Sequence, residues 1–163
     1  MILEKSAASK MLETMIPVHK FLGMQVLELE EGFAKMLFPF REEVIGDFIA
    51  RRWHGGLVAT ALDSVGGAAA ASTLTSLSDR LATIDIRVDY LRGTRTEDLV
   101  VEARVDRRGN SVIATRMWAY HPKEPDRIVA EARAAFHVNA KGMKQGDQWI
   151  TADTSNSSSN HHV

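Results

Sequence analysis

One carboxylate stands out because it interrupts a long uncharged segment. Between Trp53 and Ser78 the only charged residue is Asp63. Removing an ionised carboxylate from water costs free energy unless the charge is paired or hydrogen-bonded. Asp63 is therefore interpreted either as a functional group, acting as a general base or a nucleophile, or as a polar residue that faces a subunit boundary or water.

His54, Gly55 and Gly56 precede the apolar run that contains this carboxylate. If a helix begins there, the amides of its first turn have no intrahelical acceptor and carry the positive end of the helix dipole. Glycines let a ligand atom approach these amides closely, which suits an ester or thioester carbonyl whose oxygen becomes negative in the transition state. Two other interpretations stay open: the Gly-Gly pair only eases a tight turn, and His54 is a structural residue.

The spacing of these residues limits how they can act together. His54 and Asp63 are nine residues apart, and at about 100° per residue they point to opposite sides of a helix. They cannot form one catalytic pair on a single helix face. If both act in one reaction, the simplest arrangement joins residues from two subunits across an interface.

The elements that must position these residues are an apolar helix and a sheet. Residues 57–76 are uncharged apart from Asp63, which is typical of a buried helix. Beyond them apolar and polar residues alternate, as in an antiparallel sheet with one covered face. The expected strands are residues 84–90, 99–106, 112–120 and 128–138.

The N-terminal part is predicted to add a helix and a hairpin. Residues 5–16 have the spacing of an amphipathic helix, which Pro17 ends. Residues 24–29 and 33–38 are predicted strands around a turn that contains Gly32, and residues 40–53 a loop. The order helix, two strands, loop, helix and four strands predicts an α+β fold in which an antiparallel sheet wraps around one long central helix.

Composition and length exclude several classes of protein. The 163 residues, 45% apolar and 25% charged, fit a single globular domain. Twenty basic against 21 acidic residues argue against a nucleic-acid partner. The absence of cysteine excludes a disulfide, a thiolate zinc site and a cysteine nucleophile. The histidines lack metal-ligand spacing, so no metal is expected.

The two ends of the chain are predicted to differ. Residues 1–139 are expected to form the domain, whereas residues 140–163 are polar and without apolar pattern, as in a disordered tail. Charged residues occur within the first five positions, and the apolar segment of a secretory signal is lacking. The uncharged run around Asp63 is too rich in Ala, Gly, Ser and Thr for a membrane span. We expect a cytoplasmic protein with no membrane partner.

Residues 15–138 resemble the hotdog-fold acyl-CoA thioesterases of the PaaI-like (phenylacetate-pathway) group. The matching motif is His54-Gly55-Gly56 followed by Asp63-Ser64 and preceded by Gly46-Asp47, and the segment from Thr83 to Arg92 is similar to the family's central strand. The resemblance implies a hotdog fold and hydrolysis of an acyl-CoA thioester to free acid and CoA. It also implies active sites at the interface of a homodimer, which in relatives often pairs again into a tetramer.

The resemblance also implies roles for individual residues. Asp63 would be the base that activates water or the nucleophile that attacks the thioester. Gly56, with Gly55, would offer the amide that polarises the carbonyl, and His54 would orient the thioester or its leaving sulfur. A serine of the central strand helps to position water in members of this group, and Thr83 stands at that place here.

Asp47 departs from the pattern, because many relatives have asparagine there. A carboxylate cannot donate the hydrogen bond of an amide, and two carboxylates beside one thioester would raise each other's pKa. Three roles stay open for Asp47: a catalytic group, a partner that holds His54, or a turn residue of the loop.

Coenzyme A carries phosphates, so the mouth of the implied site should be basic. Arginine pairs well with phosphate oxygens, and glycine and asparagine let the backbone approach. The opposing interpretation is a solvated charge ladder on the outer face of the sheet. CoA would be part of the substrate, and no other cofactor is expected. The candidate contacts are Arg87, Arg92, Arg107, Arg108, Gly109 and Asn110.

Two other functions stay open. A hydroxyacyl dehydratase or hydratase of the same fold would need a histidine and an acidic residue in a motif that this sequence lacks. A non-catalytic acyl-CoA-binding domain is favoured by the exchange at Asp47 and disfavoured by the intact Asp63.

Overall fold

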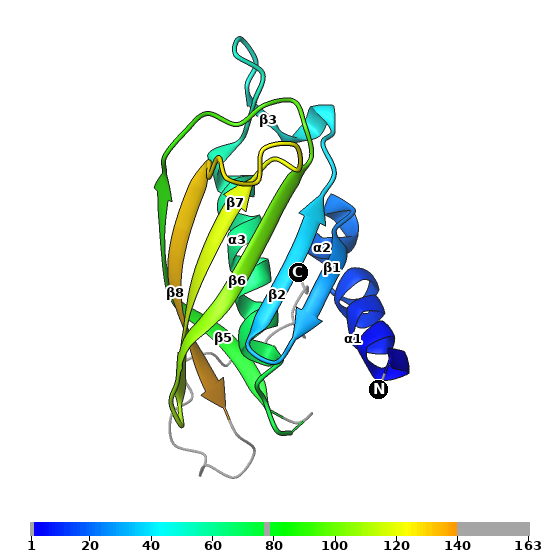
Figure 1. The fold of residues 1–163 in the computed structure, drawn as a ribbon, viewed down its shortest axis with the longest axis vertical. Helices are drawn as coiled ribbons and strands as arrows, with labels where there is room; N and C mark the ends of the chain where they lie inside the picture. Colours follow the sequence, from blue (N-terminus) through cyan, green and yellow to red (C-terminus); the bar gives the residue numbers. More distant parts are fainter. Residues whose placement is uncertain (1, 77–78, 140–163) are drawn as a thin grey trace, which may run out of the picture.

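The computed structural model describes residues 2–76 and 79–139, and its secondary structure follows the predicted order. Figure 1 shows the elements. They are α1 (Ile2–Met15), α2 (Pro17–Leu22), β1 (Gln25–Glu30), β2 (Phe33–Phe38), a 3₁₀ turn η1 (Glu42–Val44), β3 (Ile45–Asp47), β4 (Arg52–Trp53), α3 (Gly55–Ala71), β5 (Arg80–Tyr90), β6 (Leu99–Arg108), β7 (Val112–Tyr120) and β8 (Ala130–Asn139). The predicted tail, 140–163, lies outside the described residues.

Six of the strands form one antiparallel sheet in the order β1-β2-β6-β7-β8-β5. The helix α3 runs along one face of this curved sheet, roughly parallel to its strands (Figure 1). The predicted α+β class, with a sheet wrapped around a central helix, is therefore confirmed.

The core lies between α3 and the sheet. Every second residue of a strand therefore faces the helix and is buried. In β8, Ala130, Ala132, Ala134, Phe136 and Val138 are buried, while the side chains between them are less so. Small residues let α3 approach the strands closely. A Cβ on Gly66 would lie 2.5 Å from the sulfur of Met117, so this mid-helix glycine is explained by packing rather than by flexibility.

The predicted helix boundaries need two corrections. The central helix ends at Ala71 rather than at residue 76, because the hydroxyls of Ser72 and Thr73 donate to the carbonyls of Ala69 and Ala70 and replace the helical pattern there. Pro17 ends the first helix as predicted but also opens α2, at whose first position it stands, where proline is well tolerated because no amide donor is needed.

The segment 40–53 is more ordered than the predicted loop. It contains η1 and the short pair β3–β4, which projects beyond one end of the sheet (Figure 1). These pieces, of two or three residues, are too short to leave a period in the sequence. This end of the molecule also holds the start of α3, so the pair can position the residues just before that helix.

The two edges of the large sheet differ. At the β1 edge, α1 packs against the strand, and the carboxylate of Glu13 accepts a hydrogen bond from the Val26 amide at 2.7 Å. At the β5 edge no described strand or helix pairs with the outer side of the strand, and Ile84 and Tyr90 are 50% and 54% exposed. An open edge strand is a template for pairing with another chain. No helix among residues 2–76 and 79–139 is long and apolar enough to span a membrane.

Candidate functional site

His54 is held at the start of α3 by η1 and by the strand β3 that follows it. Its amide donates to the Val44 carbonyl at 2.8 Å. Gly46 lies against it so closely that a Cβ there would be 2.6 Å from the His54 Cα. The glycine of the Gly46-Asp47 motif is therefore needed because any side chain would displace His54.

The His54 side chain caps the helix. Its Nδ1 accepts a hydrogen bond from the Gly56 amide at 3.0 Å. Because Nδ1 is the acceptor, the neutral ring carries its proton on Nε2. The side chain is exposed, so this Nε2–H can donate to a bound carbonyl or thioester sulfur.

The two glycine amides are not equivalent. The Gly56 amide is engaged by His54, whereas the Gly55 amide makes no hydrogen bond to a described residue. Tyr90 donates its hydroxyl to the Gly55 carbonyl at 2.6 Å and so ties the helix start to the end of β5. Of the two predicted carbonyl-polarising groups, Gly55 is the one whose donor is free.

Asp63 lies two turns further along α3, half-buried beside β5. Thr83 donates its hydroxyl to the Asp63 Oδ1 at 3.0 Å, so the structure brings these two predicted residues together. A β-bulge between Thr83 and Asp85 shifts the pleat by one residue. This shift turns Thr83 to the same face as Tyr90, toward α3.

The predicted site thus forms two halves within one chain. His54, Gly55 and Tyr90 lie at one end of β5, and Asp63 with Thr83 lies further along it. The nine residues from His54 to Asp63 correspond to about 13 Å of helix. This separation agrees with the expectation that His54 and Asp63 of one chain do not face each other.

Asp47 acts as a turn residue in this structure. Its Oδ1 accepts hydrogen bonds from the amides of Ile49 at 3.1 Å and Ala50 at 3.0 Å. These bonds close the exposed tip between β3 and β4. Of the three roles left open for Asp47, the geometry favours this one.

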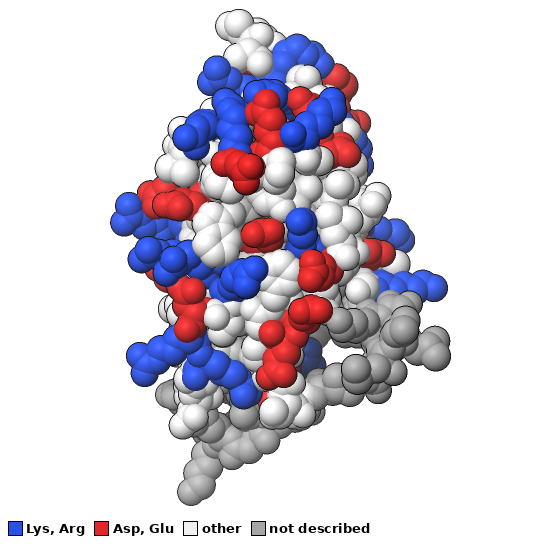
Figure 2. All heavy atoms as spheres, viewed as in Figure 1, with Lys and Arg blue, Asp and Glu red and all other residues white. Residues whose placement is uncertain are grey.

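The candidate CoA contacts do not gather in one chain. Arg92 lies near the start of α3 and donates to the Ile128 carbonyl at 2.8 Å. Arg87 lies on the outer face of β5 and pairs with Asp89 at 3.1 Å. The other four lie at the end of β6 and in the turn to β7, at the opposite end of the sheet (Figure 1): Arg107, Arg108, Gly109 and Asn110. Basic and acidic side chains are interspersed over the face shown in Figure 2.

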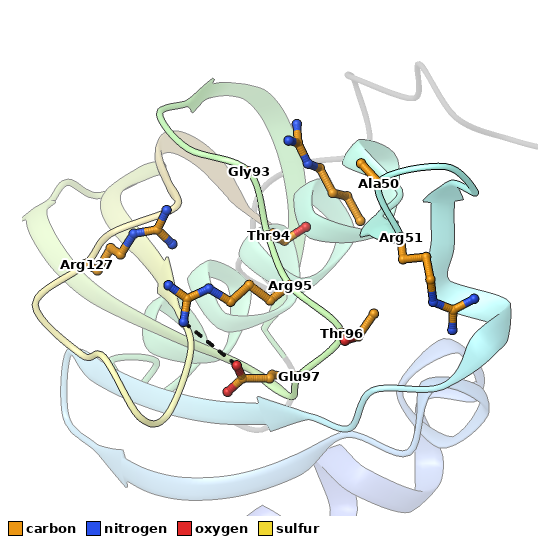
Figure 3. Close-up of a pocket in the computed structure, with 9 residues that line it drawn as sticks. Ala50, Arg51, Gly93, Thr94, Arg95, Thr96, Glu97 and Arg127 are labelled. Atoms are coloured by element: carbon orange, nitrogen blue, oxygen red, sulfur yellow. Dashed lines mark ion pairs between the residues drawn. The ribbon is translucent and has the colours of Figure 1, made fainter.

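Two depressions at the α3 end were not predicted. The first, about 340 Å³, reaches the helix start at Gly55 and is walled by apolar groups of Trp53, Val58, Tyr90 and Leu91. The second, about 560 Å³, lies beside it and is lined by arginines and threonines (Figure 3). The sequence gives little signal for either, because their walls come from loops without a period.

A carboxyl group near these depressions has a lowered pKa. Arg95 donates two hydrogen bonds to Glu124, at 2.9 and 3.1 Å, and lowers the pKa of that carboxyl. Among the residues that the structure describes, no three acidic or histidine side chains gather closely enough to hold a metal ion.

Comparisons with known proteins agree with this geometry. A profile of the thioesterase superfamily matches residues 52–124, which include the start of α3, Asp63 and Thr83. The medium/long-chain acyl-CoA thioesterase YigI of Escherichia coli strain K12 is 33% identical over 135 residues, 76% of this chain and 86% of that protein. A putative esterase of Halobacterium salinarum is 33% identical over 130 residues, 72% of this chain and 82% of that protein. A solved structure from Shewanella oneidensis, related to the thioesterase superfamily, has a TM-score of 0.72 at 26% identity and covers 83% of this chain and 95% of that one.

Proposed function

Because the chain belongs to the thioesterase superfamily, we propose that it hydrolyses acyl-CoA thioesters to a free acid and CoA. The observation that carries the proposal is the Asp63–Thr83 pair, a half-buried carboxylate oriented by a hydroxyl on the strand that forms the open edge. The activity named for the Escherichia coli relative supports the choice of an acyl-CoA substrate. A non-catalytic acyl-CoA-binding domain would have no need of a water-activating carboxylate. A dehydratase or hydratase would need the histidine and acidic residue of a motif that this sequence lacks.

We place the complete site between two subunits that join through β5. The β5 edge is open while the β1 edge is covered by α1, so β5 is the strand available for pairing. Two copies of one strand that meet about a two-fold axis run antiparallel. The Asp63 half of one copy then approaches the His54 half of the other.

We also infer a register for this pairing from the contacts along β5. Tyr90 marks the His54 half and Thr83 the Asp63 half, so Thr83 of the partner subunit should lie opposite Tyr90. Because the bulge adds one residue between Thr83 and Asp85, Thr83 lies where residue 84 would lie in a regular strand. Placing Thr83 opposite Tyr90 is therefore equivalent to pairing residues 84 and 90 of a regular strand. The midpoint of that pairing is residue 87, so the two-fold axis should pass beside Arg87.

The chemistry follows from the donors and acceptors at the two halves. The Thr83 hydroxyl occupies Oδ1 of Asp63, which leaves Oδ2 to accept a proton from a water molecule. The Nε2–H of His54 orients the thioester by donating to its sulfur. The water oxygen attacks the thioester carbon, and the carbonyl oxygen, now negative, accepts from the free Gly55 amide. The carbon–sulfur bond then breaks, and the thiolate takes the proton from Asp63. Direct attack by Asp63 is the alternative route to the same products.

Thiol release from a series of short, medium, long and aryl-acetyl CoA thioesters tests this function. We expect the wild-type protein to hydrolyse at least one acyl class, and Asp63→Asn to lose about 100-fold or more of kcat, since general-base catalysis contributes about 10²–10⁴-fold. Ser64→Ala is the matched control, because the Ser64 hydroxyl bonds only to the Thr60 carbonyl within the same helix. No thiol release from any thioester, or an Asp63→Asn protein of wild-type activity, would overturn the proposal.

Three further points belong to the same proposal. A homodimer is the smallest assembly that completes the site, and pairing of two dimers into a tetramer is compatible with it. Membership of the PaaI-like group is a prediction from the His54-Gly55-Gly56 motif. A cytoplasmic location likewise remains a prediction from the sequence.

A further inference from the structure

A basic depression beside the helix start has no role in the proposed hydrolysis. Its lining contains four arginines and one glutamate (Figure 3). Three separate segments contribute to it: the β3–β4 pair, the connection 93–97 after β5, and the connection before β8. The lining residues are Ala50, Arg51, Arg52, Gly93, Thr94, Arg95, Thr96, Glu97 and Arg127.

The four arginines differ in how completely acidic side chains of the protein neutralise their positive charge. Arg51 pairs with Glu42 at 2.5 Å, and Figure 3 shows its guanidinium turned away from Thr94 and Thr96. Arg95 is bonded twice to Glu124. Their charges are therefore already balanced by acidic groups of the protein.

Arg52 and Arg127 are balanced less completely. Arg52 has no acidic partner among the described residues, and its guanidinium lies over Gly93. Arg127 forms only a long ion pair, at 3.8 Å, with Glu124, which Arg95 already engages with two hydrogen bonds, and the buried Nη1 of Arg127 has no hydrogen-bond partner among the described residues. Cations that line one depression without full counter-charges are stabilised by a bound anion.

The floor of the depression is held rigidly. Trp53 donates its amide to the Thr94 hydroxyl at 2.9 Å and its indole N–H to the Glu97 carbonyl at 3.0 Å. The buried His121 accepts from the Arg95 amide and donates to the Asp98 carbonyl, both at 2.9 Å. The segment 94–98 is thus fixed before any ligand arrives, which lowers the entropic cost of binding.

This depression adjoins the apolar one at the helix start. Both are lined by Arg52, Gly93 and Thr94, so they share one wall. A ligand whose thioester lies at Gly55 could pass over that wall and end among the arginines. Such a ligand has a neutral arm and an anionic terminus.

We propose that the depression binds the phosphate groups at the nucleotide end of the CoA thioester, with Arg52 and Arg127 as the anchoring cations. This inference rests on the proposed function and extends it: the enzyme would select nucleotide-bearing thioesters over thioesters of the pantetheine arm alone. It also moves the expected phosphate contacts from the β6–β7 turn to the α3 end of the same chain.

Paired substrates test the inference. Arg52→Gln and Arg127→Gln should each raise KM for an acyl-CoA by about 10-fold, as expected for loss of a charge-assisted contact, with kcat changed little. KM for the matching S-acyl-pantetheine, which lacks the nucleotide, should stay at the wild-type value. Arg116→Gln, which removes an exposed arginine paired with Asp106 on the sheet, is the matched control. Equal losses on both substrates, or an unchanged KM for the acyl-CoA, would overturn the inference.

Binding of adenosine 3′,5′-bisphosphate, measured by calorimetry, separates this inference from the proposed function. If no thioester is hydrolysed but the bisphosphate binds and Arg52→Gln weakens it about 10-fold, the depression is a phosphate site and the hydrolase proposal fails. If thioesters are hydrolysed but the bisphosphate does not bind, the hydrolase proposal stands and the depression is not the nucleotide site.

Discussion

The proposed register of β5 can be tested by a single cysteine. The chain contains no cysteine, so Arg87→Cys gives a protein with one thiol at a known place. If the two-fold axis passes beside residue 87, the two Cα atoms lie directly opposite each other, about 4.5–5.5 Å apart in an antiparallel pair. A disulfide needs about 4.4–6.8 Å, so oxidation should join the two subunits.

The cost of this change to the fold is small. The Arg87–Asp89 ion pair that it removes is exposed, with side chains 77% and 42% accessible, and such pairs contribute about 0–1 kcal/mol. The assay is a non-reducing gel after mild oxidation. Arg116→Cys is the control: β7 lies two strands in from the open edge, which places its two copies roughly 24 Å apart.

A second pair of cysteines distinguishes this register from its neighbours. Asp85→Cys and Asp89→Cys should cross-link with each other when the two proteins are mixed, because 85 lies opposite 89 in a pairing centred on 87. Asp85→Cys alone should not, since its two copies would be about 13 Å apart along the strands. Cross-linking of Asp85→Cys with itself, or equal yields for Arg87→Cys and Arg116→Cys, would refute the register.

The remaining predictions concern the helix start and the loops around it. Gly46→Ala should lower kcat about 10-fold and destabilise the protein by about 1–3 kcal/mol, because the new methyl overlaps His54; wild-type kinetics would show that His54 need not stay in place. The Arg95–Glu124 bonds lower the pKa of Glu124 below 4.5, so their stabilisation is present above that pH and is lost as the pH falls through the lower folded-state pKa. Melting curves of wild type and Glu124→Gln should therefore differ at pH 7 and converge as the pH falls below 4.5, whereas a constant difference would contradict the ion pair.

Much of the fold could be predicted because its long strands and its central helix show a regular pattern of apolar and polar residues. Eleven residues of β5 and ten of β8 give enough alternation to identify a sheet with one covered face, and the uncharged run around Asp63 identifies the helix beneath it. The resemblance to hotdog-fold thioesterases is confirmed at the level of the superfamily. The pair β3–β4 and the helix α2 were missed because segments of two to six residues show no period.

The site was harder to predict because its geometry depends on distant contacts. The approach of Gly46 to His54, and the bond from the Trp53 indole to the Glu97 carbonyl, join residues that no local pattern connects. The bulge that turns Thr83 toward Asp63 is also invisible in the alternation. Arg92 and Arg107 were grouped by chemistry alone, but the length of β6, about 33 Å for ten residues, separates them within one chain.

The most direct test of the shared site is complementation between two inactive subunits. His54→Ala and Asp63→Asn chains, co-expressed with different affinity tags, can be isolated as a heterodimer. One of its two sites then lacks both groups, while the other has His54 from one chain and Asp63 from the other. A site built by two subunits predicts about half of the wild-type thioesterase activity in the heterodimer, with each homodimer nearly inactive. A heterodimer no more active than its parents would contradict the account.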